Sequence, residues 1–133
     1  MRGIDTNVLF RLVLVDDAEQ MSRARLLLPN AELSDPLYIN HIVLAEFIWV
    51  MTRHLKENRA IVDQMVRQLL DDPSFHVERG PLVRLALEDF KSSKADFADC
   101  LIGAVNRAAG CGTTYTFDRN ASALETFTDV PPQ

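Results

Sequence analysis

The chain has 133 residues, with 14 Lys plus Arg against 19 Asp plus Glu, a net charge of −5 and 47% hydrophobic residues. This composition is typical of an ordinary globular protein, and we expect residues 1–133 to form a single domain without support from a disulfide or zinc site. The negative charge excludes a general polyanion binder, because such proteins present a broad basic surface.

The cysteines and the N-terminus indicate the compartment. Cys100 and Cys111 form neither a disulfide framework nor a zinc motif, so reduced thiols are expected. The first residues lack the apolar run of a secretory signal. The longest uncharged apolar run, between Glu46 and Arg53, is far shorter than the roughly 20 residues of a membrane helix. We therefore expect a cytoplasmic protein that does not contact the membrane.

Short predicted strands alternate with helices along the chain. An apolar stretch, 8–14, follows the first predicted strand. Asn58 is expected to cap the start of the helix 58–70, and Gly110 the end of the helix 95–109. Pro29-Asn30 is expected to end the helix 18–28. This alternation predicts an α/β fold around a small parallel sheet covered by helices. The predicted strands are 2–4, 37–39, 75–77 and 113–117, and the predicted helices are 18–28, 41–55, 58–70, 81–90 and 95–109.

Two acidic residues follow predicted strands. Asp5 comes after the first strand and Asp118 after the last. Ligands bind beyond the carboxyl ends of strands in open parallel sheets, so both carboxylates are candidate site residues. The alternative is that each residue is simply an N-cap, since Asp is favoured at the start of a helix.

Glu46 is the only charged residue in an otherwise apolar segment, 42–51. Ile42 and Trp49 share its side of the predicted helix. An ionised carboxylate buried there needs a partner, which would be a metal ion or, as a purely structural alternative, an arginine. We favour a metal-facing role.

Asp96 and Asp99 lie three residues apart at the start of a predicted helix, where the helix dipole favours acidic side chains. N-capping by Asp96, with Asp99 as an acid of the first turn, would account for both without any function. Asp99 leads into the face that carries Ile102, Gly103 and Asn106, so we expect its carboxylate to point inward and to be functional.

Carboxylates that share a pocket repel one another unless a hard cation lies among them. Mg²⁺ and Mn²⁺ take oxygen ligands and bind phosphate, which suits hydrolysis of a phosphodiester by a metal-activated water. No other nucleophile is evident, because the sequence has no nucleophile elbow or phosphate-binding loop. The scattered histidines His41, His54 and His76 are expected to be structural or solvated.

Four motifs together resemble a known family. They are Asp5-Thr6-Asn7-Val8, Glu46 within its helix, the segment 96–102 and Thr116-Phe117-Asp118. In order and spacing, the chain is similar to PIN domains, most closely to the VapC-like toxins of toxin–antitoxin pairs, over nearly its whole length. This resemblance implies a three-layer α/β/α fold with a small, mainly parallel sheet of four to five strands.

The resemblance also implies an activity. PIN domains of this kind are Mg²⁺- or Mn²⁺-dependent endoribonucleases, so the four acids that would bind the metal and carry catalysis are Asp5, Glu46, Asp99 and Asp118. Three further residues, Asp96, Thr116 and Asn7, match positions that would support those ligands. The expected partners are an RNA substrate, a cognate antitoxin whose C-terminal segment covers the site, and a second copy of the chain in a homodimer.

Two questions stay open at this level. Arg11, Arg53, Lys94 and Arg119 are candidate RNA contacts by their proximity in sequence to the acids, but each taken singly is better explained as a solvated surface charge, and none is placed in the site. The alternative function is a catalytically silent PIN fold that binds RNA or a protein partner. The presence of all four acids favours the nuclease.

Overall fold

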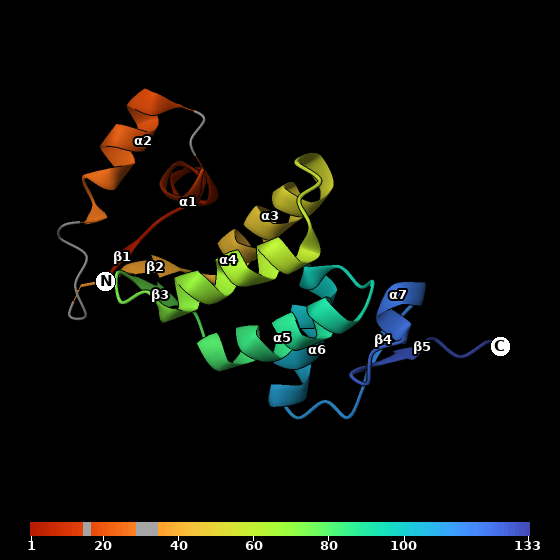
Figure 1. Cartoon of the computed structure of the whole chain (residues 1–133). Helices are drawn as coiled ribbons and strands as arrows, with labels where there is room; N and C mark the ends of the chain where they lie inside the picture. The colour runs from red at the N-terminus through yellow and green to blue at the C-terminus, as the bar shows by residue number, and fades with distance from the viewer. Residues whose placement is uncertain (15–16, 29–34) are drawn as a thin grey trace.

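The computed structural model describes residues 1–14, 17–28 and 35–133. All strand pairs in these residues are parallel, and they form two separate sheets. A three-stranded sheet has the order β1-β2-β3, and a two-stranded sheet consists of β4 and β5. The two sheets lie on different sides of the molecule (Figure 1). Their strands are β1 (Arg2–Gly3), β2 (Leu37–Ile39), β3 (Phe75–Val77), β4 (Thr114–Thr116) and β5 (Phe127–Asp129).

The strand register brings Gly3 beside Tyr38 and Thr116 beside Asp129. On β1, the amides of Arg2 and Ile4 bond toward β2, so the amide of Gly3 between them faces the opposite edge. The free edge of this very short strand therefore offers few backbone groups for pairing.

The helices begin where capping residues stand in the sequence. Asp5, Asn40 and Asp118 each accept a hydrogen bond from an amide of the following turn, and Asn58 caps the fourth α-helix through the amide of Ala60. The α-helices are α1 (Thr6–Val13), α2 (Ala18–Arg25), α3 (His41–Trp49), α4 (Arg59–Asp71), α5 (Gly80–Ser92), α6 (Phe97–Ala108) and α7 (Arg119–Ser122).

The third helix continues into a π-helical segment, η2 (Val50–His54). Its wider turn is visible in the bond from the Leu55 amide to the Val50 carbonyl, at 3.0 Å. Lys56 then adopts a left-handed backbone conformation with φ of 51°. The sequence predicts a helix over 41–55, and the structure confirms it while adding this change of winding.

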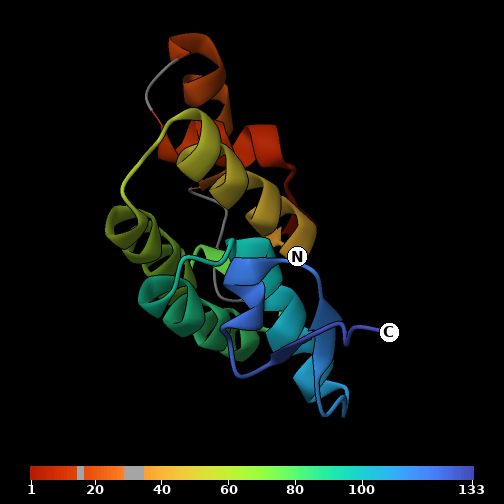
Figure 2. The ribbon, with the colours of Figure 1, turned by 90° about the vertical axis from the view of Figure 1, so that its right-hand side faces the viewer.

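The helices enclose one buried cluster of apolar side chains. Its largest fully buried members include Phe47 of α3 and Phe90 of α5. Helices α1, α2 and α3 lie at the top of the molecule, and α5 and α6 lie below them with the C-terminal elements (Figure 2). Gly103 of α6 lies so close to Thr126 that a Cβ atom would be 2.3 Å from its hydroxyl oxygen. This contact fixes α6 against the segment that enters β5.

The observed elements agree with the predicted α/β class. Residues 1–14, 17–28 and 35–133 contain five parallel strands, which form a three-stranded and a two-stranded sheet where one sheet of four to five strands was expected. Strand β5 was not predicted, and the expected stop at Pro29-Asn30 lies outside the described residues. Gly110, with φ of 100°, ends α6 as expected. No helix in the described ranges is both long and apolar enough to cross a bilayer.

Candidate functional site

Three of the acids lie close together at the C-terminal side of the molecule. We call Asp96, Asp99 and Asp118 the C-terminal acidic cluster. Asp96 is the N-cap residue of α6, Asp99 lies in the first turn of that helix, and Asp118 begins α7. The Asp118 carboxylate accepts from the Ala121 amide at 2.8 Å, so the N-cap alternative is realised in the fold. A carboxylate has further lone pairs, so capping leaves the second oxygen of Asp118 for a ligand.

The electrostatics of this cluster centre on Asp99. Burial raises the pKa of its half-buried carboxyl group, and the negative charges of Asp118 and Asp96 raise that pKa further. An inward-pointing Asp99 was expected from the sequence, and its partial burial agrees with that expectation. A cation placed among these three carboxylates would relieve their repulsion.

Thr116 supports this cluster through the backbone. Its hydroxyl oxygen accepts a hydrogen bond from the amide of Asp118 at 2.9 Å. The bond ties the end of β4 to the start of α7 and holds Asp118 at that junction. Thr116 therefore contacts the residue that it was expected to support.

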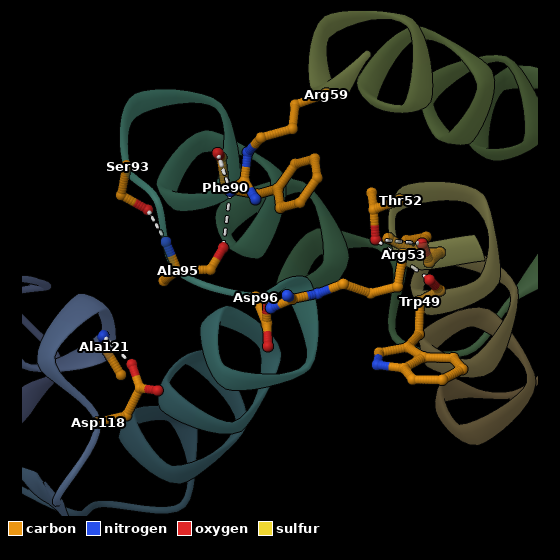
Figure 3. Close-up of polar contacts among 11 residues, drawn as sticks. Trp49, Thr52, Arg53, Arg59, Phe90, Ser93, Ala95, Asp96, Asp118 and Ala121 are labelled. Carbon is orange, nitrogen blue, oxygen red and sulfur yellow. Dashed lines mark hydrogen bonds and ion pairs between the residues drawn. The ribbon is translucent and has the colours of Figure 1, made fainter. Parts of the chain in front are cut away.

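Asp96 has a cation as its partner. Its side chain makes no capping bond to α6 and instead accepts from Nη2 of Arg53, with 2.5 Å between the oxygen and the nitrogen. Figure 3 shows the Arg53 side chain extending from the end of the third helix to Asp96. Both side chains are substantially exposed. Of the predicted RNA contacts, Arg53 is thus the one held directly against the cluster.

Arg59 anchors the connection between α5 and α6. It donates hydrogen bonds from Nη2 to the carbonyls of Phe90 and Ala95, at 2.7 and 2.6 Å, and its guanidinium lies 3.7 Å from the centroid of the Phe90 ring (Figure 3). The Ala95 amide also donates to the Ser93 hydroxyl. Sequence reasoning did not single out Arg59, because its contacts join residues more than 30 positions apart.

The other two acids have a different environment. We call Asp5 and Glu46 the N-terminal acid pair. Asp5 is exposed and accepts from the Val8 amide at 2.9 Å as the N-cap of α1. Glu46 accepts a hydrogen bond from the hydroxyl of Thr6 at 3.0 Å, and Thr6 directly follows Asp5 in the chain. The two acids are therefore linked through one neighbouring residue.

The expectation that Glu46 is buried is wrong. Its side chain is exposed, as are its neighbours on the same helix face, Ile42 at 71% and Trp49 at 50%. The apolar composition of α3 suggested burial on all sides, but no element covers this face within the described residues. The exposure of Glu46 therefore removes the argument from burial for a metal ion or an arginine as its partner.

The remaining expected residues lie on surfaces. Asn7 is exposed on α1. Lys94 and Arg119 line one surface hollow between the α5–α6 connection and α7, and Arg11 donates to the side chain of Gln20. His41 contacts the backbone of Glu78, which agrees with a structural role.

The ligand chemistry of the C-terminal acidic cluster fits a hard divalent cation. No group of three or more Asp, Glu, His or Cys side chains is arranged to hold a metal in the ranges 1–14, 17–28 and 35–133. Mg²⁺ needs only one or two protein carboxylates, because it retains waters and takes substrate phosphate oxygens. Asp99 and Asp118 provide such a pair, whereas the structure does not bring the N-terminal acid pair into a common ligand set with them.

Comparison with known families matches residues 4–126 to the PIN domain. The chain therefore belongs to the PIN domain family. It is also similar to a VapC ribonuclease from Aquifex aeolicus (strain VF5), with 22% identity over 124 residues, which covers 93% of this chain and 92% of that protein.

Proposed function

We propose that this protein is a Mg²⁺- or Mn²⁺-dependent endoribonuclease, acting in the cytoplasm as the toxin of a toxin–antitoxin pair. The observation that carries the proposal is the placement of the half-buried Asp99 beside Asp118 and Asp96, where burial, and then the charges of these two carboxylates, raise its pKa. Such a site favours binding of a cation that neutralises the carboxylates. The family and the similarity to a VapC ribonuclease support RNA as the substrate.

Asp99 and Asp118 would hold the metal, and Asp96 would stand beside them with Arg53. When bound, the metal would lower the pKa of a water and neutralise charge on the phosphate. Asp99 would orient that water through its carboxylate oxygen, and the bond from the Asp118 amide to Thr116 would fix Asp118. We retain Asp5 and Glu46 as candidate ligands of the same site on the basis of the family membership.

The partners follow from the same proposal. The chain would act as a homodimer, and a cognate antitoxin would inhibit it by covering the acids with its C-terminal segment. These partners are drawn from the family resemblance and the similarity to VapC.

The decisive experiment is cleavage of a mixed structured RNA pool by the purified protein with Mg²⁺, with Mn²⁺ and with EDTA. Asp99→Asn is the test variant, and Asp71→Asn is the matched control because Asp71 is an exposed aspartate on α4 that pairs with Arg84. Metal-dependent cleavage that is lost only in Asp99→Asn would support the nuclease. Absence of cleavage together with absence of metal binding by calorimetry would favour a silent PIN fold that binds RNA or protein.

A further inference from the structure

Arg59 joins two segments of the chain that lie more than 30 positions after it. It is the first residue of α4, and its Nη2 atom donates to the carbonyl of Phe90 at 2.7 Å and to the carbonyl of Ala95 at 2.6 Å. Phe90 lies in the last turn of α5, and Ala95 directly precedes Asp96, the N-cap residue of α6. One guanidinium nitrogen therefore bridges the end of one helix and the start of the next (Figure 3).

The two carbonyl groups depend on this bridge. Ala95 is fully buried and Phe90 is 1% exposed, so bulk water does not reach either oxygen. The last carbonyls of a helix have no amide within the helix to accept from, and the negative end of the helix dipole attracts a cation there. A side chain without these donors would leave buried oxygens unpaired, which costs free energy unless the connection moves to admit water.

The guanidinium of Arg59 is itself held in place. Its Cζ atom lies 3.7 Å from the centroid of the Phe90 ring, so that packing and hydrogen bonding fix the same orientation. Burial lowers the pKa of Arg59, and Cys100 and Asp96, both near the start of α6, oppose this shift. The side chain is thus close to the beginning of α6 in its electrostatics as well as in its hydrogen bonds.

The helix start that Arg59 contacts carries two acids of the C-terminal acidic cluster. The first backbone hydrogen bond of α6 runs from the Cys100 amide to the Asp96 carbonyl, at 3.1 Å, and Asp99 lies within the turn that this bond closes. Asp118 belongs to a different part of the chain, the junction of β4 and α7, where the Thr116 hydroxyl holds its amide. The placement of Asp99 beside Asp118 therefore depends on where α6 begins.

We propose that Arg59 is a positioning residue of the candidate metal site, which holds the start of α6 so that Asp99 and Asp118 together bind a divalent cation. This inference rests on the proposed function and deepens it, because it names a residue outside the acidic cluster that sets the affinity for the metal. Side chains that orient metal ligands change the affinity without touching the metal. Arg53 contributes an exposed ion pair to the Asp96 side chain, whereas Arg59 acts through buried backbone groups.

Calorimetric titration of the purified protein with Mn²⁺ alone tests this role. Arg59→Met keeps an apolar stem against Phe90 but removes the donors, and we expect it to weaken Mn²⁺ binding about 10-fold. Arg59→Lys keeps a cation with N–H donors and should retain most of the affinity. Arg67→Met is the matched control, because Arg67 also joins α4 to α5 but bonds to Asp63 and Glu88, away from the α5–α6 connection, and it should leave the affinity unchanged. If Arg59→Met does not fold, Arg59→Gln replaces it, since its amide is too short to bridge both carbonyls.

Amide hydrogen exchange of the metal-free protein supplies a measurement that does not depend on the metal. Arg59→Met should accelerate exchange of the Cys100 amide, because the first turn of α6 opens more often without the bridge. The Leu44 amide makes the equivalent first bond of α3, to the Asn40 carbonyl at 3.1 Å, and its exchange should stay unchanged. Equal acceleration at both amides would indicate general destabilisation and would overturn the inference.

The outcomes separate this inference from the proposed function. Unchanged Mn²⁺ affinity in folded Arg59→Met, or an equal loss in Arg67→Met, would overturn the positioning role while the unsubstituted protein still binds the metal and cleaves RNA. If the unsubstituted protein does not bind Mn²⁺, the metal-dependent nuclease is refuted, and the exchange rates alone decide whether Arg59 holds the start of α6.

Discussion

The N-terminal acid pair and the C-terminal acidic cluster contain the same chemical groups in different environments. Asp5 and Glu46 are both exposed. Asp5 accepts a hydrogen bond from the Val8 amide, and Glu46 accepts one from the Thr6 hydroxyl. Asp99, in contrast, is half-buried and its pKa is raised by burial and by two neighbouring carboxylates. The difference shows that the environment of a carboxylate is set by the side chains packed around it more than by its position at the end of a strand or on a helix.

The largest expected effect concerns catalysis. Asp99→Asn and Asp118→Asn are expected to reduce the cleavage rate by about 100-fold or more, because they remove charge that would hold the metal and stabilise the transition state. Glu46→Gln should reduce it less, since glutamine can still accept the hydrogen bond from Thr6. Single-turnover cleavage rates at saturating Mn²⁺ measure the loss in each of the three variants. Equal losses in all three variants would erase the distinction between the two groups of acids.

A second prediction tests how the C-terminal acidic cluster is supported. Gly103→Ala places a Cβ atom 2.3 Å from Thr126 Oγ1 and 2.9 Å from Phe127 Cε2, so α6 and β5 must separate. We expect a loss of about 1–3 kcal/mol in the free energy of unfolding, measured with urea. Gly112→Ala is the control, because a Cβ atom there meets no atom within 4 Å. Similar losses in both variants would refute close packing at Gly103.

A third prediction concerns stability and pH without metal. A carboxyl group whose pKa is raised in the folded protein destabilises that state at a pH above the raised value, and this penalty fades as the pH falls toward the ordinary value. Asp99→Asn should therefore raise the melting temperature at pH 7 in EDTA, and its advantage should shrink on acidification. Glu46→Gln should change the melting temperature little at pH 7, because glutamine can still accept the hydrogen bond from Thr6. A lower melting temperature for Asp99→Asn at pH 7 would contradict the crowding.

The smallest expected effect is on thiol reactivity. Cys100 follows Asp99 and is fully buried, and burial raises the pKa of its thiol to about 12, whereas Cys111 is exposed. In the native protein, a thiol reagent at pH 8 should modify Cys111 rapidly and Cys100 only when α6 opens. Mass spectrometry of a time course distinguishes the two sites. Rapid modification of Cys100 would indicate that the surroundings of Asp99 are loosely packed.

The sequence predicts local features well. N-caps such as Asn58, the C-cap Gly110 and the periodicity of α4 depend on neighbouring residues, so they can be read directly from the chain. Strand β5 was missed because three residues, Phe127–Asp129, become a strand only by pairing with β4. The exposure of Glu46 was also missed, because hydrophobicity around α3 does not reveal which face remains uncovered. Which carboxylates crowd one another likewise depends on tertiary contacts, such as that between the start of α6 and the start of α7.

The brevity of the outer strands affects self-association. β1 has two residues, and the amide of Gly3 faces its outer edge, while on β4 the amide of Tyr115 faces away from β5. An intruding strand could form only one or two backbone hydrogen bonds at either edge, too few to nucleate a growing cross-β stack. The edges of β1 and β4 thus offer little template for the addition of a strand, even though aromatic side chains such as Phe117, at 87% exposure, stand next to one of these edges.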